Sequence, residues 1–151
     1  MARVSAGILL YRRGTAGIEV LLVHPGGPFW VKKDAGAWML PKGELHPDEE
    51  PLAGAQREFA EETGIRLAAD ASYMPLGEVR QRSGKTVIAF ALESDCDPRA
   101  IRSNTFEIEW PPRSGKQQQF PEIDRAAFFT LAEAHEKILP SEAAFLDRLN
   151  S

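Results

Sequence analysis

The sequence predicts an α/β fold in which a sheet of mixed strands is covered by helices on both faces. Two observations lead to this prediction. Short apolar, β-branched runs occur on both sides of one central helical segment, and two further helical segments follow the last strand. The chain has 151 residues, of which 43% are hydrophobic, and this favours one compact domain, 1–151, with a single core.

The first strands are expected in a hairpin. Residues 4–11 and 18–23 are apolar and β-branched, and the turn 14–17 between them contains two glycines. Residues 24–37 then form a loop rich in glycine, proline and lysine, and residues 38–40 form a short strand.

A helix is expected from Pro51 to Gly64. Proline suits the first helical position, and the acidic residues before it suit the positive end of the helix. Glycine is the usual left-handed residue at a helix end. Leu52, Ala55 and Phe59 recur at spacings of three and four, which predicts a buried stripe.

The remainder of the chain predicts four strands and two helices. Apolar and acidic residues alternate at 106–110, as in a half-buried strand, and a polar loop at 111–120 follows. Pro140 separates the two helices, with Ser141 as the N-cap of the second. The strands are expected at 74–80, 86–92, 106–110 and 126–130, and the helices at 131–138 and 142–149.

Three glutamates of the central helix are the candidate ligands for a metal ion. Glu58, Glu61 and Glu62 stand at positions i, i+3 and i+4, so a helix places them on one face. Like charges at these spacings oppose the helix by about 0.2–0.5 kcal/mol per pair. Oxygen ligands grouped in this way are what a hard divalent cation such as Mg²⁺ or Mn²⁺ requires. The alternative interpretation is a solvated acidic helix face.

The segment 43–65 resembles the Nudix box, G-x5-E-x7-R-E-U-x-E-E-x-G-U, in which U is a bulky apolar residue. Every fixed position is filled, from Gly43 and Glu49 through Arg57 to Ile65. At ordinary residue usage, a chance match to this pattern in the chain is below about one in a million. The spacing therefore favours a metal site over a solvated face.

The resemblance implies a Nudix-type α/β/α sandwich with a mixed sheet. It also implies metal-dependent hydrolysis of a pyrophosphate bond in a nucleoside diphosphate linked to another group. The leading substrates are nucleoside triphosphates and dinucleoside polyphosphates, because residues 38–44 (WMLPKGE) are similar to a segment of family members that act on dinucleoside polyphosphates. The run 106–126 also resembles a bacterial subgroup of predicted nucleotide pyrophosphohydrolases.

The same resemblance implies roles for individual residues. Mg²⁺ or Mn²⁺ is the expected cofactor, with Glu58, Glu61 and Glu62 as side-chain ligands. A backbone carbonyl of Lys42 or Gly43 is the expected further ligand. The box arginine orients a glutamate in this family, so the sequence predicts that Arg57 pairs with Glu49 or Glu61.

The general base is left open between Glu61 and Glu122, because Glu122 precedes an aromatic strand that is similar to a late motif of the family. A long polar stretch before Glu122 suggests a mobile loop that closes over bound phosphates. Lys42 is either a point charge for phosphate or a solvated lysine, and Lys85 is a further phosphate candidate, with Arg113 and Lys116. Trp30 in its polar loop, with Phe29, is the favoured surface for stacking on a base, whereas Trp110 is expected in the core.

Composition limits the partners. The net charge is −4 and no basic stripe occurs, so no nucleic-acid polymer is expected as a partner. No apolar run near the N-terminus is long enough for a membrane span, and Cys96 is the only cysteine, so we expect a cytoplasmic protein. The oligomeric state is left open. A non-catalytic Nudix-fold sensor that binds a nucleotide, and an enzyme acting on RNA 5′ ends, are the alternative functions.

Overall fold

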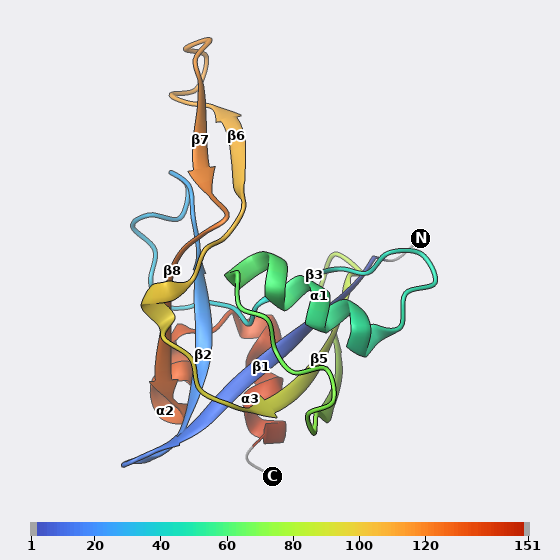
Figure 1. The fold of residues 1–151 in the computed structure, drawn as a ribbon. Coiled ribbons are helices and arrows are strands. Elements are labelled where there is room, and N and C mark those ends of the chain that lie inside the picture. The colour runs from blue at the N-terminus through green and yellow to red at the C-terminus, as the bar shows by residue number, and fades with distance from the viewer. Residues whose placement is uncertain (1–2, 150–151) are drawn as a thin grey trace.

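The computed structural model describes residues 3–149, which form a six-stranded mixed sheet with helices on both faces (Figure 1). The strands of this sheet are β1 (Val4–Gly14), β2 (Gly17–Pro25), β3 (Lys42–Glu44), β4 (Met74–Arg80), β5 (Thr86–Glu93) and β8 (Ile123–Thr130). Their order is β4-β5-β1-β2-β8. β1 pairs parallel with β5 and antiparallel with β2 and β3, so β2 and β3 follow one another along the same edge of β1.

The helices cover opposite faces of the sheet, and alternate residues of β1 show this directly. Ile8 packs with Ala55 and Phe59 of α1 (Pro51–Thr63). Its neighbour Leu9 packs on the other face, with residues of α2 (Leu131–Lys137) and α3 (Ala143–Leu149) such as Phe145. Side chains of a strand alternate between faces, so β1 separates two apolar cores. The predicted α/β/α sandwich is confirmed.

The central helix begins and ends where the sequence predicts. Pro51 occupies its first turn, and Gly64 follows its last residue with a left-handed φ of 74°. The Gly64 N–H donates to the Ala60 carbonyl at 2.8 Å. Ala55 and Phe59 of the predicted stripe are fully buried.

Residues 38–40 do not form the predicted strand. Trp38 and Met39 make only isolated bridges, and β3 begins at Lys42 instead. Pro41 lies between them and has no N–H to donate, which interrupts the ladder. Ser141 is also not an N-cap, because it lies inside the short 3-10 helix η2 (Pro140–Glu142) that leads directly into α3.

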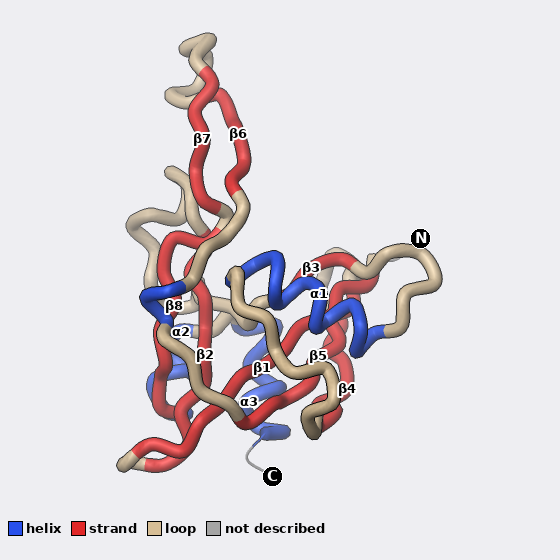
Figure 2. Tube along the Cα trace, in the orientation of Figure 1, coloured by secondary structure: helices blue, strands red, loops and turns tan. Residues whose placement is uncertain are grey.

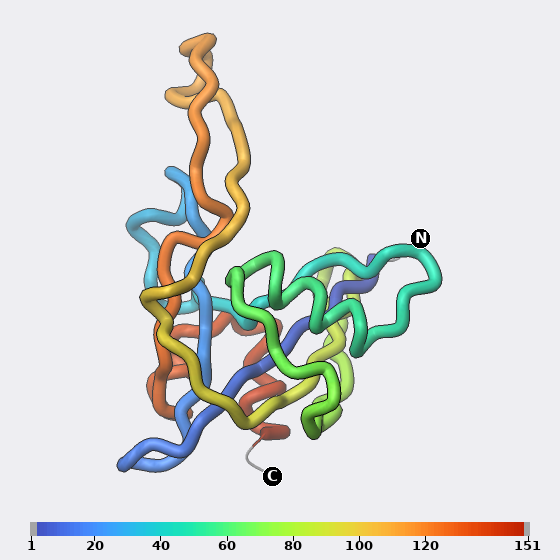
Figure 3. The backbone as a smooth tube through the Cα atoms, in the orientation of Figure 1, coloured from blue at the N-terminus to red at the C-terminus, as the bar shows by residue number. Residues whose placement is uncertain are grey.

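The predicted polar loop at 111–120 is partly a strand. Residues of β7 (Gln117–Pro121) pair with β6 (Thr105–Glu109), and the resulting hairpin projects from the body of the protein (Figures 2 and 3). The Phe106 and Phe120 rings contact each other at its base, with centroids 6.0 Å apart. The strand predicted at 106–110 is thus confirmed as β6, whereas its partner β7 lies in a polar segment whose local sequence shows no strand pattern.

The chain between β5 and β6 contains one further 3-10 helix, η1 (Pro98–Ala100). Within residues 3–149, no helix has both the length and the apolar character needed to cross a membrane.

Candidate metal centre

Helix α1 directs its three box glutamates into one cleft of about 480 Å³, which we call the acidic cleft. Glu122, at the junction of β7 and β8, lies in the opposite wall. The structure thus brings together all four carboxylates that the sequence singles out. The cleft is lined by Gly43, Glu44, Leu45, His46, Pro47, Glu58, Glu61, Glu62, Asn104 and Glu122.

Glu58 is the most buried of the box glutamates, and Gly43 makes room for it. A Cβ atom on residue 43 would lie 1.9 Å from Glu58 Oε2, so only glycine allows the carboxylate this position. Burial raises the pKa of Glu58, and the hydrogen bond from Arg57 opposes the rise. The first glycine of the box therefore has a packing role that the sequence pattern does not disclose.

Arg57 joins the helix to the preceding loop. Its Nε and Nη2 atoms each donate to Glu49 at 2.9 Å, the bidentate geometry that a guanidinium allows. Its Nη1 atom donates to Glu58 at 2.8 Å and to Glu61 at 3.1 Å. Both expected partners of Arg57 are present, and Glu58 is a third. Hydrogen bonds from Arg57 lower the pKa of Glu49 to about 2.

Glu62 lies among negative charges that the charge of Lys42 offsets only in part. Its half-buried position raises its pKa to about 7, and the charges of Glu122 and Glu58 add to the rise. Within residues 3–149, no donor forms a hydrogen bond with the carboxylate of Glu62 or of Glu122. The carboxylate oxygens of Glu62 and Glu122 are therefore available as ligands for a cation.

The donor set fits a hard divalent cation. Carboxylate oxygens are the ligands that Mg²⁺ and Mn²⁺ prefer, and a cation would offset the charge that raises the pKa of Glu62. In the present side-chain positions, no group of three or more acidic, histidine or cysteine residues among those described could hold a metal ion. Arg57 instead occupies oxygens of Glu58 and Glu61.

Glu122 lies on ordered backbone rather than on a free loop. Its N–H donates to the Asn104 carbonyl, and its carbonyl accepts from Gly26, both at 2.8 Å. Two chain segments thus hold the backbone of Glu122, and closure of the polar stretch before it over bound phosphates stays a prediction. The side chain itself is exposed toward the acidic cleft.

The two lysines expected to bind phosphate lie away from the acidic cleft. Lys42 pairs across β3 and β1 with Gly7, whereas its neighbour Gly43 faces α1. The Lys42 ammonium group is 9% exposed and contacts Glu142 at 2.8 Å, on the opposite face of the sheet. Lys85 lies near the same pair, and burial, followed by the charge of Lys42, lowers its pKa. The alternation of side chains along β3 thus corrects the phosphate role expected for Lys42.

A second, apolar cleft adjoins the acidic one. The loop after β2 lies beside the β6–β7 hairpin, where Phe29 packs edge-on against Trp110 with ring centroids 5.3 Å apart (Figure 1). Trp110 is therefore half-buried on the hairpin and not in the core as expected. Phe29 is 63% exposed, and Trp30 is half-buried. This apolar cleft, of about 340 Å³, is lined by Gly27, Pro28, Val31, Phe120, Pro121 and Asp124.

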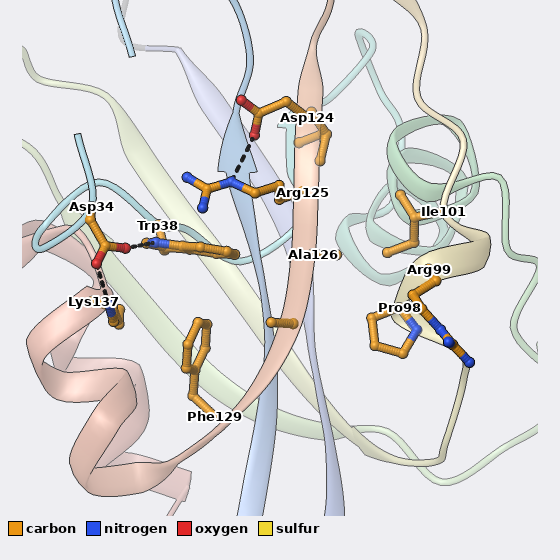
Figure 4. Close-up of a pocket in the computed structure, with 12 residues that line it drawn as sticks. Asp34, Trp38, Pro98, Arg99, Ile101, Asp124, Arg125, Ala126, Phe129 and Lys137 are labelled. Atoms are coloured by element: carbon orange, nitrogen blue, oxygen red, sulfur yellow. Dashed lines mark hydrogen bonds and ion pairs between the residues drawn. The ribbon is translucent and has the colours of Figure 1, made fainter. Parts of the chain in front are cut away.

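A further cavity, of about 560 Å³, lies along the edge strand β8 (Figure 4). Its polar groups already have partners, because Asp34 accepts from Trp38 Nε1 at 2.8 Å and pairs with Lys137. Asp124, at its rim, contacts the buried His24 at 2.8 Å. The Asp34–Lys137 and His24–Asp124 contacts could not be predicted from local patterns, since each joins segments about 100 residues apart in the chain. This cavity lacks the free carboxylates of the acidic cleft.

The chain was compared with known proteins. The family model described as "NUDIX domain" matches residues 1–149. An RNA pyrophosphohydrolase of Bartonella henselae is 36% identical over 86 residues, which cover 48% of each chain. The present chain therefore spans about half the length of that relative.

Two solved structures have a similar fold. The NUDIX domain of Shewanella oneidensis NrtR, complexed with ADP ribose, superposes with a TM-score of 0.67 and 17% identity, covering 99% of this chain and 87% of that one. An Ap4A hydrolase of C. elegans, in a binary complex, gives a TM-score of 0.63 and 18% identity, covering 97% and 95%. At these identities the likeness concerns the fold.

Because the pKa of Glu62 is raised, we expect Glu62→Gln to increase the stability of the metal-free protein in a pH-dependent way. Ionised Glu62 is less favourable in the folded than in the unfolded chain. Its ionisation therefore does not destabilise the folded protein below pH 4.5, the pKa in the unfolded chain, and destabilises it fully above pH 7. We expect Glu62→Gln to be more stable than wild type by about 1–3 kcal/mol near pH 8, and equal near pH 4. Urea unfolding with a chelator measures this difference. A variant that is less stable near pH 8 would contradict the assignment of unbalanced charge to Glu62.

Proposed function

Because the chain belongs to the Nudix family, we propose that it hydrolyses a pyrophosphate bond in a nucleoside diphosphate linked to another group. The substrate is a nucleoside triphosphate or a dinucleoside polyphosphate, and the cofactor is Mg²⁺ or Mn²⁺. One observation supports this most strongly: five glutamates line one cleft, and within residues 3–149 two of them, Glu62 and Glu122, accept no hydrogen bond and form no ion pair.

The chain supplies ligands for the cation from two elements. Glu58, Glu61 and Glu62 of α1 would hold it, with the backbone carbonyl of Lys42 or Gly43. Bound there, the cation offsets the phosphate charge and lowers the pKa of a bound water. Arg57 fixes the directions of Glu58 and Glu61 through the hydrogen bonds of its Nη1 atom.

Glu122 is the better candidate for the general base. A base must accept a proton from the attacking water, so its oxygens have to be free and close to the ligands. Glu61 already accepts a hydrogen bond from Arg57, whereas Glu122 accepts none from the described residues. The charge of Glu122 acts on Glu62, which places the two carboxylates near each other.

The apolar cleft would hold the base of the nucleotide. It adjoins the acidic cleft because Pro121, in its wall, directly precedes Glu122. Phe29 and Trp30 present aromatic surface on the same loop, and aromatic side chains stack on any base. Phosphates in the acidic cleft and a base on this loop are compatible with one bound nucleotide.

A second candidate substrate is the 5′ end of RNA. It is favoured by the 36% identity with a relative named as an RNA pyrophosphohydrolase. The net charge of −4 opposes binding of a long polyanion. A short 5′-triphosphorylated RNA therefore belongs in the same substrate panel.

The substrate class is tested by incubating the purified protein with nucleoside triphosphates, dinucleoside polyphosphates and 5′-triphosphorylated RNA, with products separated by chromatography. We expect Mg²⁺- or Mn²⁺-dependent cleavage of a nucleotide. Glu62→Gln should lower turnover by at least about a hundredfold, because a catalytic cation supplies several kcal/mol of transition-state stabilisation. Glu50→Gln, an exposed glutamate before α1, is the control. Full activity in a folded Glu62→Gln protein would remove the cleft from the reaction.

A metal titration separates the roles of Glu61 and Glu122. A general base acts in the chemical step, so Glu122→Gln should lower kcat by about a hundredfold and leave the metal concentration for half-activity unchanged. Glu61→Gln should raise that concentration and lower turnover together. If Glu122→Gln keeps kcat within about twofold of wild type, Glu61 is the base.

Stacking predicts an effect on substrate binding alone. Phe29→Ala and Trp30→Ala should each raise KM by about five- to a hundredfold at nearly constant kcat, because stacking is worth about 1–3 kcal/mol per base. Met74→Ala is the matched control, since Met74 is also an exposed apolar side chain but lies on the distant edge strand β4. Unchanged KM in both aromatic variants would exclude this loop from the base site.

A further inference from the structure

Glu142 is a fully buried carboxylate whose contacts all lie in one short segment before the Nudix box. Its Oε1 atom accepts from the Leu40 N–H at 3.1 Å. Its Oε2 atom lies 2.8 Å from Lys42 Nζ. Glu142 thus holds the two residues that flank Pro41, although it follows them by about 100 positions in the chain.

This segment has a different neighbour on each face of the sheet. Lys42 is opposite Gly7 in the β1–β3 register, and Gly43 is opposite Ala6. Because side chains alternate, Lys42 faces η2 while Gly43 faces α1. On the α1 side, residue 43 has no room even for a Cβ atom next to Glu58. A shift of the segment on one face therefore moves the wall of the acidic cleft on the other.

The contacts of Glu142 hold this segment firmly. The Lys42 side chain is 9% exposed and that of Glu142 is 0% exposed, so water cannot replace either partner without rearrangement. Removal of one partner would leave a buried charge unpaired, which is strongly unfavourable. The Pro41 carbonyl also accepts from the Ile8 N–H at 3.2 Å. The hydrogen bonds of Leu40 and Pro41, together with an ion pair in which Glu142 Oε2 accepts no hydrogen bond from the described residues, hold residues 40–43 between β1 and η2.

We propose that Glu142 is a positioning residue for the metal centre. Through Lys42 and the Leu40 amide it fixes the segment that packs against Glu58, and it thereby sets the affinity of the acidic cleft for a divalent cation. The proposal rests on the proposed function in one respect, the assignment of that cleft to the cation. It also explains why Lys42 is buried instead of facing the phosphates.

Mn²⁺ binding without nucleotide tests the proposal. Free Mn²⁺ is measured by electron paramagnetic resonance during titration of folded protein, with the fold of each variant checked by circular dichroism. Glu142→Gln should raise the Kd for Mn²⁺ by at least about tenfold, the scale seen when outer-shell partners of metal ligands are lost. Glu136→Gln, an exposed glutamate of α2, is the matched control and should not change the Kd. A folded Glu142→Gln protein with a Kd within about twofold of wild type would overturn the proposal.

A double variant keeps the test decisive if Glu142→Gln does not fold. Lys42→Met should weaken Mn²⁺ binding by about tenfold, because Glu142 is then unpaired. Lys42→Met/Glu142→Met replaces the ion pair by apolar side chains. On a logarithmic scale, its Kd for Mn²⁺ should return at least about halfway from that of Lys42→Met to that of wild type. Wild-type affinity in Lys42→Met, or no recovery in the double variant, would overturn the proposal.

These outcomes are separate from those of the proposed function. Mn²⁺ binding with the predicted dependence on Glu142, but no cleavage of any nucleotide, would refute only the proposed hydrolysis. Nucleotide cleavage together with Mn²⁺ binding that is indifferent to Glu142 would refute only the positioning role.

Discussion

The confinement of five carboxylates in one cleft is the constraint on which the rest of the structure depends. Arg57 balances part of this charge, and its two bonds to Glu49 hold it in place between α1 and the preceding loop. Within residues 3–149, Glu62 and Glu122 have no such partner, and burial, followed by the charges of Glu122 and Glu58, raises the pKa of Glu62 to about 7. A cation bound in the cleft would offset this repulsion and stabilise the folded chain.

Strand β3 connects this centre to the opposite side of the sheet. It has only three residues, and the alternation of its side chains gives neighbouring positions unrelated surroundings. Gly43 leaves space for Glu58, whereas Lys42 is buried against Glu142. The sequence run that ends in Pro-Lys-Gly is therefore best understood as a structural element that aligns the centre, with the glycine on one face and the ion pair on the other.

Local patterns account for what could be predicted from the sequence. The central helix has its proline, its apolar stripe and its glycine end within a few turns, so its bounds and its acidic face follow from spacing. Strand β6 could also be predicted from its alternating residues, whereas its partner β7 and the partner of Lys42 could not be predicted in this way. Both depend on contacts between distant segments, such as the edge-on packing of Phe29 on Trp110 and the reach of Glu142 back to Leu40.

The central claim is that the acidic cleft binds a divalent cation through the box glutamates. The most direct measurement is anomalous diffraction from crystals of the protein soaked in Mn²⁺, which locates the ion without reference to activity. We predict a single strong peak bounded by Glu58, Glu62 and the backbone at Gly43, with ligand distances of roughly 2.0–2.3 Å. A protein that cleaves nucleotides in Mn²⁺ but shows its peak elsewhere, or no peak in this cleft, would contradict the account.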